Sequence, residues 1–181
     1  MDAAWAFTVA ALLWVYLGIQ KGQVTQDGLT GLNNRRRLDQ YMWELDERSG
    51  ERETCCYLLM DVNKFKKVND TYGHVTGDEV LRLVAEQLKR TFGNMQAVLA
   101  RYGGDEFVVI VKGKTQDEMD VIIHQTQENV NAIAWGADTP WQLSISIGCA
   151  MRGEQGKQKS HELLALADER MYRQKKGIQD R

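Results

Sequence analysis

The sequence predicts an α+β fold in which helices pack on an antiparallel or mixed sheet, and three observations support this prediction. Helix-like and strand-like patterns follow one another in the order helix, strand, helix, hairpin, helix, strand, helix. The apolar run Cys55–Val62 ends in an aspartate and is typical of a buried central strand. The residues Gly103-Gly104-Asp105 separate two further strand-like segments, which indicates a β-hairpin. The strands and the helices between them therefore predict a ferredoxin-like βαββαβ core sheet with packed helices.

Local patterns justify each element in chain order. Asn33 and Asn34 offer an N-cap for a first helix that should end at about Arg48. After the strand Cys55–Val62 we expect a polar loop, and then a second helix that begins at Thr76 or Asp78. The remaining elements are expected to be strands at 97–102 and 106–111, a helix from 115 to about 133, a half-buried strand at 143–150, and a helix capped by Ser160 that ends at about Lys176.

The composition is that of a globular domain. The chain has 181 residues, of which 43% are hydrophobic and 27% charged, with a formal net charge of -2 at pH 7. This balance gives no sign of a basic face that would attract nucleic acid, so we expect no nucleic-acid partner. The three cysteines lie in strand-like runs without the spacing of a metal site, and we interpret them as buried, reduced thiols.

The N-terminal residues differ from the rest of the chain. Residues 3–19 carry no charged side chain, and at about 1.5 Å per residue a helix of this length just reaches across a hydrocarbon core of about 30 Å. A cleaved signal peptide is disfavoured because Asp2 stands where a basic start is usual. We therefore expect a transmembrane helix and a short linker over residues 1–26, followed by one domain over residues 27–181.

Carboxylates stand at two points that suit metal chemistry. Asp61 closes the buried strand, and Asp105 and Glu106 stand at the glycine turn. On a ferredoxin-like sheet the end of the first strand and the central hairpin are neighbours, so Asp61 and Asp105 should meet at one edge. Such oxygen ligands suit Mg²⁺ that carries substrate phosphates, and a metal pair there would serve an in-line displacement. Taken alone, however, Asp105 is also explained as a simple turn former.

A segment dense in polar side chains, residues 61–79, lies between these points. Lys66 suits a phosphate group as a point charge. Asn69 and Asp78 suit the edge of a purine, because an amide both donates and accepts hydrogen bonds and a carboxylate accepts them from N–H groups. A solvated loop with helix caps is the simpler interpretation of this composition, and a lone histidine such as His74 more often packs in a loop than acts as a base.

Several motifs in the chain resemble those of GGDEF domains. Residues 101–107 (RYGGDEF) resemble the signature of that family, and residues 27–36 (DGLTGLNNRR) resemble its opening motif. Residues 61–79 resemble its nucleotide segment, and residues 144–148 (SISIG) its late strand. Four residues of the last helix match as well: Ala167, Asp168, Met171 and Tyr172. The resemblance covers roughly residues 27 to 176.

This resemblance implies a fold of the nucleotidyl-cyclase and polymerase-palm type. It also implies a diguanylate cyclase, which condenses two GTP molecules into cyclic di-GMP, releases two pyrophosphates, depends on Mg²⁺ or Mn²⁺ and works at the interface of a homodimer. With the N-terminal segment, it implies attachment to the inner membrane of a bacterium, with the catalytic domain in the cytoplasm.

The resemblance further implies roles for single residues. The metal ligands would be Asp61, the backbone carbonyl of Val62, Asp105 and Glu106. Asp105 would also accept the proton of the attacking 3′-hydroxyl, with Glu106 and Lys66 as further catalytic residues. The substrate-binding residues would be Asn69 and Asp78 at the guanine, Leu32 and Phe65 lining the base pocket, His74 as a further contact, and Lys175 at a phosphate.

Some positions depart from the family pattern. The family often continues its last helix with a lysine, two residues and then Gly-Arg-Asn, whereas Ile178 and Gln179 follow here, so a second phosphate-binding cation is missing. Asn63 stands where a second aspartate is common. A GTP-binding regulatory module with weak or no catalysis and a cyclase with a mixed dinucleotide product therefore stay open. Asn94 and Ala97 replace the arginine and aspartate with which many relatives bind inhibitory product.

Overall fold

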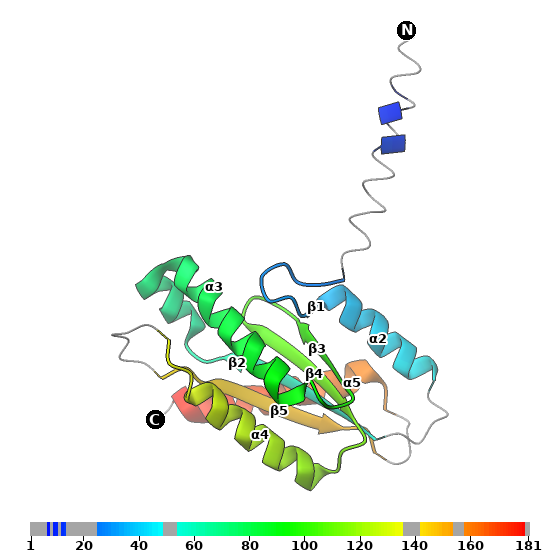
Figure 1. Ribbon diagram of the computed structural model, residues 1–181. Helices are drawn as coiled ribbons and strands as arrows, with labels where there is room; N and C mark the ends of the chain where they lie inside the picture. Colours follow the sequence, from blue (N-terminus) through cyan, green and yellow to red (C-terminus); the bar gives the residue numbers. More distant parts are fainter. Residues whose placement is uncertain are drawn as a thin grey trace.

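The computed structural model describes residues 25–48, 54–135, 142–153 and 158–179, together with Phe7, Val9, Ala10, Leu12 and Leu13. In this part of the chain one five-stranded sheet is covered by helices on both faces (Figure 1). The elements in chain order are β1 (Asn33–Asn34), α2 (Arg35–Glu47), β2 (Cys55–Val62), α3 (Phe65–Phe92), β3 (Ala97–Arg101), β4 (Glu106–Lys112), α4 (Gln116–Asn131), β5 (Ile145–Met151) and α5 (Ser160–Gln179).

The strand order confirms the predicted α+β class. The sheet runs β1-β3-β4-β2-β5. β2 pairs antiparallel with both β4 and β5, and β3 pairs antiparallel with β4. The order β2-α3-β3-β4-α4-β5 is therefore the predicted βαββαβ core. The short β1 was not predicted, and it makes the sheet mixed because it lies parallel to β3.

Two apolar layers form the core, one on each face of the sheet. Alternate residues of β2 point to opposite faces, as Leu58 and Met60 do against Tyr57 and Leu59. The first pair belongs to the layer under α3 and α4, and the second to the layer under α2 and α5 (Figure 1). Burial of both faces explains why the run Cys55–Val62 carries no polar alternation.

The prediction of a loop after β2 was wrong. Helix α3 begins at Phe65, and its backbone departs from helical geometry at Gly73, where φ is 83° and ψ is 164°. Lys64, with φ of 58°, makes the turn out of the strand in the left-handed region. Polar composition hid the part of this helix before Gly73, because Val68 is the only buried residue in it, and the glycine resembled a loop residue.

Strand β5 is more enclosed than its alternating sequence predicted. All of Ile145, Ser146, Ile147 and Gly148 are buried, because helices cover both faces of the strand. Cys149 is only half-buried, against our expectation of three buried thiols, while Cys55 and Cys56 are buried as predicted.

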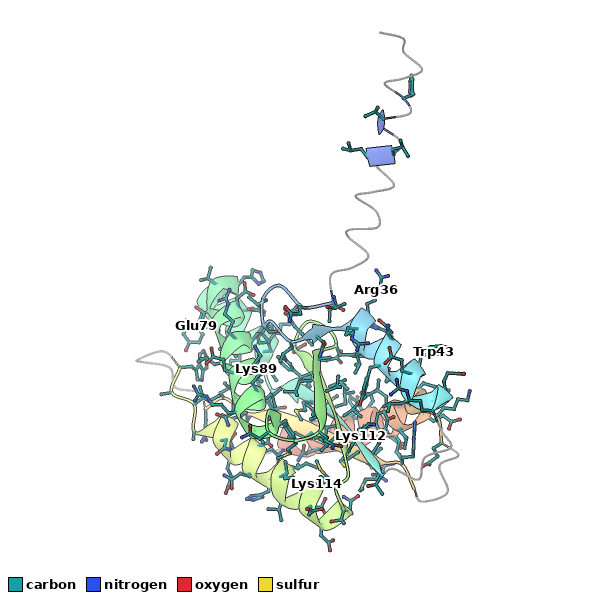
Figure 2. The ribbon with its side chains drawn as sticks, turned by 45° about the vertical axis from the view of Figure 1, so that its right-hand side comes forward. Arg36, Trp43, Glu79, Lys89, Lys112 and Lys114 are labelled. Carbon is teal, nitrogen blue, oxygen red and sulfur yellow. The ribbon has the colours of Figure 1, made fainter. Side chains whose placement is uncertain are left out.

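The opening segment is joined to helix α3 by a lysine. Lys89, whose side chain is labelled in Figure 2, donates from Nζ to the backbone oxygen of Thr30 at 2.8 Å. Gly31 beside it has a φ of 66°, a conformation that glycine adopts without strain. Asn34 caps α2 as predicted, since its side chain accepts from the backbone N–H of Arg37.

A buried polar network joins the end of α2, the residue after β5 and the beginning of α5. Arg152 Nη2 donates to Asp46 Oδ1 at 2.7 Å and to the hydroxyl of Tyr57 at 3.1 Å. Asp46 also accepts from the backbone N–H of Ser160 at 3.0 Å and from its hydroxyl at 2.7 Å. We had predicted that Ser160 caps its own helix. Its side chain instead forms hydrogen bonds to Tyr57 of β2 and Asp46 of α2.

Loss of the Asp46 carboxylate should strongly destabilise the protein. The side chains of Arg152 and Asp46 are only 8% and 18% exposed, so Asp46→Ala would leave a buried charge without its partner. We expect the free energy of unfolding in urea to fall by about 3 kcal/mol. Glu47→Ala, on the exposed side of the same helix, should stay within about 0.5 kcal/mol of the parent. A loss at Asp46 no larger than that of the control would contradict a stabilising role of this polar network.

The transmembrane helix expected at residues 3–19 lies outside the described residues, apart from Phe7, Val9, Ala10, Leu12 and Leu13. None of the helices in the described ranges is long and apolar enough to cross a membrane.

Candidate active site

The carboxylates of β2 and the hairpin lie at one edge of the sheet. Asp61 is the register partner of Glu106, and the backbone N–H of Val62 donates to the backbone oxygen of Asp105 at 3.2 Å. Burial raises the pKa of Asp61, and the charge of Asp105 raises it further. Burial also raises the pKa of Glu106, and the charges of Asp61 and Asp105 raise it further. The predicted meeting of these residues is therefore present, and the negative charge gathered there favours a cation.

Lys175 of α5 forms an ion pair with one of these carboxylates. Its Nζ donates to Asp61 Oδ1 at 2.6 Å. The two side chains are 26% and 8% exposed, so the pair is largely shielded from water. This contact lowers the pKa of Asp61, although burial outweighs it. Lys175, which the resemblance assigns to a phosphate, thus lies against a candidate metal ligand.

The residues at this edge fit a hard divalent cation that takes some of its ligands from the protein and the others from a substrate. No three histidine, cysteine, aspartate or glutamate side chains form a ready cage for an ion in the ranges that the structure describes. Mg²⁺ usually takes only one or two carboxylates and completes its octahedron with water and phosphate oxygens. Asp61, Asp105, Glu106 and the carbonyl of Val62 offer oxygen donors of this kind.

The glycine turn is shaped by an ion pair that sequence reasoning had not singled out. Arg101 donates to the backbone oxygen of Gly104 through Nη2 at 2.7 Å and through Nε at 3.1 Å. Its Nη1 lies 3.3 Å from the carboxylate of Asp27. A Cβ on Gly103 would lie 2.7 Å from Glu106 Oε2, so glycine lets that carboxylate lie close under the turn. Both ends of the ion pair stand in recognised motifs, and their opposite charges were the available signal.

The candidate base-binding residues gather along α3. A Cβ on the buried Gly77 would lie 1.9 Å from Asn69 Oδ1 and 3.3 Å from Phe65 Cζ, so both side chains lie against this glycine. Asp78 follows it and is exposed. No hydrogen bond to the side chain of Asn69 or Asp78 forms within the described part, so both remain available to a ligand. Leu32 is buried in the core beneath, and Phe65 packs against the same cluster.

Among the described residues, two predicted site residues, Lys66 and His74, form no hydrogen bond or ion pair with the carboxylate edge. Lys66 and His74 are both exposed on α3. Over the described ranges, no hydrogen bond or ion pair joins either of them to Asp61, Asp105 or Glu106. Their assignment therefore rests on the resemblance and, for Lys66, on its positive charge.

Asn63 forms two side-chain hydrogen bonds that the sequence did not predict. Its Nδ2 donates to Ser144 Oγ at 3.1 Å, and its Oδ1 accepts from Ser146 Oγ at 2.7 Å. The amide uses its donor and its acceptor together, which an aspartate cannot do when ionised. Asn63 thereby fixes the exit of β2 just before Lys64 turns the chain into α3.

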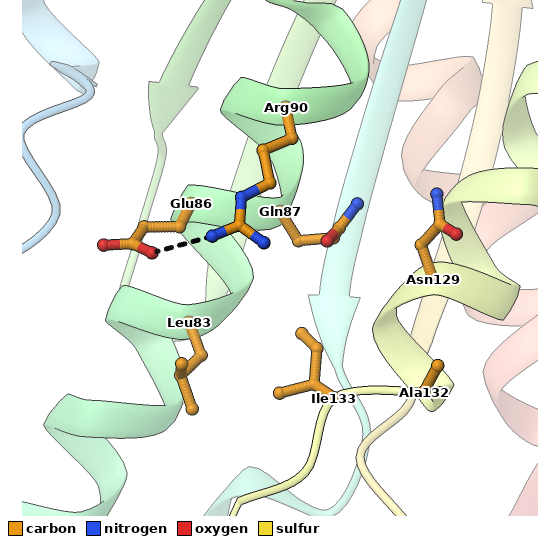
Figure 3. A pocket seen from close by; sticks show the side chains of 7 residues that line it. All are labelled: Leu83, Glu86, Gln87, Arg90, Asn129, Ala132 and Ile133. Carbon is orange, nitrogen blue, oxygen red and sulfur yellow. Dashed lines mark ion pairs between the residues drawn. The ribbon is translucent and has the colours of Figure 1, made fainter.

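Two cavities in the described part of the domain differ in their relation to these residues. A cavity of about 350 Å³ lies between α3 and α4, where Arg90 pairs with Glu86 at 3.8 Å (Figure 3). It contains none of the predicted site residues. Another of about 300 Å³, between α2 and α5, is bordered by Glu106, His161 and Asp168. The second cavity therefore adjoins the carboxylate edge through Glu106.

The sheet order and the carboxylate edge define an α+β domain with a cation-attracting site at the end of its central strands. The chain belongs to the GGDEF domain family, because the family model described as "Diguanylate cyclase, GGDEF domain" matches residues 24–181.

Curated relatives carry the same domain in longer chains. The probable diguanylate cyclase DgcC of Escherichia coli strain K12 is 33% identical over 160 residues, which cover 87% of this chain and 42% of that protein. Diguanylate cyclase DosC of the same strain is 34% identical over 159 residues, covering 85% and 34%. The chain thus spans less than half the length of these relatives.

Solved structures share the fold. The coiled coil and GGDEF domain of DgcB from Caulobacter crescentus, in complex with c-di-GMP, superimposes with a TM-score of 0.79 at 27% identity, covering 97% of this chain and 94% of that one. The GGDEF domain of TpbB, also called YfiN, from Pseudomonas aeruginosa gives a TM-score of 0.73 at 28% identity, covering 84% and 89%.

Proposed function

We propose that this domain is a diguanylate cyclase that condenses two GTP molecules into cyclic di-GMP. In each of two steps the 3′-hydroxyl of one nucleotide attacks the α-phosphorus of the other, a P–O ester bond forms, and the bond to pyrophosphate breaks. The single observation that carries the proposal is the meeting of Asp61, Asp105 and Glu106 at one sheet edge in a chain of the GGDEF family.

The carboxylate edge supports a role in proton transfer and charge placement. Asp105 accepts the proton of the attacking 3′-hydroxyl, and its place on the glycine turn lets a substrate approach the backbone closely. Asp61, Asp105, Glu106 and the carbonyl of Val62 hold the divalent cation, either Mg²⁺ or Mn²⁺. When bound, that cation supplies Lewis-acid stabilisation of the charge on the reacting phosphate.

The other candidate residues bind and orient the nucleotide. Asn69 and Asp78 form hydrogen bonds to guanine, whose base lies near Leu32 and Phe65. Lys66 and Lys175 meet the phosphates, and His74 makes a further contact. Each of these contacts places the α-phosphorus for in-line attack, an arrangement like that of the palm-type nucleotidyl transferases.

Incubating the chain with GTP and Mg²⁺ tests the proposal. Release of pyrophosphate and appearance of cyclic di-GMP are expected. GTP binding without turnover would instead favour the regulatory module, a second candidate that is supported by the altered sequence after Lys175. Adding ATP and analysing products by mass spectrometry would reveal a mixed dinucleotide.

Assembly should limit the rate, because each domain holds one GTP and two domains must face each other. Residues 20–26 are too short for a coiled-coil stalk of several heptads. A fragment of residues 27–181 should therefore be mainly monomeric in analytical ultracentrifugation, with specific activity that rises with protein concentration. A tight dimer of this fragment, with constant specific activity, would contradict this expectation.

Membrane attachment completes the proposal. Residues 3–19 anchor the protein in the inner membrane of a bacterium, and the catalytic domain faces the cytoplasm, where GTP is available. Fractionation of cells that express the full chain and a form starting at residue 27 tests this. Equal release of both forms into the soluble fraction would refute the anchor.

Product should not inhibit tightly through the position known from many relatives. Asn94 lacks the planar cationic fork that binds phosphate, and Ala97 lacks any acceptor for a guanine edge. Losing both partners should cost several kcal/mol, at about one to three for each. Calorimetric titration with cyclic di-GMP should thus show no submicromolar binding that depends on Asn94. Such binding, lost on Asn94→Ala, would show the inference from these positions to be wrong.

A further inference from the structure

The outer edge of β5 is covered by side chains where another strand would otherwise pair. β5 ends the sheet order, so alternate backbone groups on its outer side have no strand partner among the described residues. Gln174 Oε1 accepts from the backbone N–H of Ile147 at 2.6 Å, and Gln127 Nε2 donates to the oxygen of Ile145 at 3.2 Å. Arg170 donates to the oxygen of Cys149. Side chains of α4 and α5 therefore satisfy three backbone groups of this edge.

Gln174 directly precedes the lysine that reaches the carboxylate edge. Neighbouring residues of a helix point about 100° apart, so one side chain can bind the edge of a sheet while the next extends over its face. Gln174 does the first, and Lys175 does the second by donating to Asp61 Oδ1 at 2.6 Å. The two contacts are adjacent on the sheet as well, because Ser146, which precedes Ile147, is the register partner of Asp61.

Gln174 ties the last turns of α5 to the outer edge of β5, beside the bond of Lys175 to Asp61. Further back, the helix lies against β5 at Gly148, where a Cβ would lie 1.9 Å from the backbone oxygen of Ala167. That contact lies in the middle of the helix, so the rotation of its last turns depends on further contacts such as that of Gln174. The helix ends at Gln179, little more than a turn beyond Lys175, and helix ends fray.

We propose that Gln174 is a positioning residue, which sets the rotation of the last turns of α5 and so holds Lys175 Nζ at Asp61, where a substrate phosphate would arrive. The inference rests on the proposed cyclase activity for its kinetic consequence, but its structural basis is the bond to Ile147. Gln127 strengthens the arrangement, since its Nε2 also lies 3.3 Å from Gln174 Oε1.

A double-mutant cycle in the full chain tests the proposal. Gln174→Met keeps the length of the side chain but removes the acceptor, and it should lower kcat/KM for GTP about tenfold or more. In a Lys175→Met background the same replacement should change kcat/KM by less than about twofold, because Gln174 acts through Lys175. Arg170→Met is the matched control, since it removes a bond to the same edge one turn earlier, and it should leave kcat/KM within about twofold.

A second measurement does not depend on turnover. Hydrogen exchange of the Ile147 amide should be at least about tenfold slower in the parent chain than in Gln174→Met, while the melting temperature of the variant stays within about 4 °C. Equal exchange in both, additive losses in the cycle, or an equal loss in Arg170→Met would each overturn the positioning role. A parent chain that binds GTP but forms no cyclic di-GMP would refute the cyclase proposal instead, and the exchange result would still decide on Gln174.

Discussion

Replacing Asp105 by asparagine should lower the rate of cyclic di-GMP formation by at least about a hundredfold, the usual scale for a lost catalytic group. The change keeps the shape of the side chain but removes its charge and its ability to take a proton. The turn itself should survive, because Arg101 still binds the carbonyl of Gly104 and Asp105 still offers its backbone oxygen to Val62. The loss should therefore appear in kcat and not in folding.

The control for this variant is the exposed Asp120 of α4, which is not among the candidate site residues. Its Oδ1 accepts from Gln116 at 2.7 Å on the same helix. Asp120→Asn should leave both kcat and the melting temperature close to those of the parent. An Asp105→Asn protein with near-normal turnover would remove the mechanism proposed for this site.

Selectivity for GTP over ATP should be large as well. A site that binds a base through hydrogen bonds rejects an analogue that leaves its polar groups unpaired, and for enclosed sites this discrimination reaches about 10⁴-fold. Asp78 is exposed, so we expect a smaller ratio of kcat/KM, at least about a hundredfold in favour of GTP.

Removing the carboxylate of Asp78 should reduce this selectivity without unfolding the domain. Asp78→Ala leaves Gly77 and the contact of Asn69 with it unchanged, so binding of the phosphates should persist while discrimination between the bases falls. The comparison is made from initial rates with each nucleotide alone. Equal use of GTP and ATP by the parent chain would refute the assignment of Asn69 and Asp78 to guanine.

Elements with strong local signals were predictable from the sequence. Asn34 and Thr115 accept from the backbone N–H groups three residues later, so the beginnings of α2 and α4 followed from residues next to them in the chain. The start of α3 at Phe65 was missed for the opposite reason. Its first half buries little apolar surface, and the left-handed turn at Lys64 is not marked by a glycine.

Contacts between distant parts of the chain were the least predictable. The meeting of Asp61 with the hairpin followed from the expected strand order, because register is a property of the whole sheet. The pairing of Lys175 with Asp61 and the network of Ser160 with Asp46 each join residues 114 positions apart. Such contacts depend on how a helix is rotated on the sheet, and no local pattern of apolar residues specifies that angle.

The close approach at Gly148 has a consequence for protein engineering. Replacing glycine by alanine is a common route to a more stable protein, since it narrows the range of conformations open to the unfolded chain. At position 148 the new methyl group would lie 1.9 Å from the oxygen of Ala167 and 2.4 Å from the nitrogen of Met171, and both are backbone atoms that cannot rotate away. Position 148 is therefore closed to all nineteen other side chains, and libraries that diversify this strand should leave it as glycine.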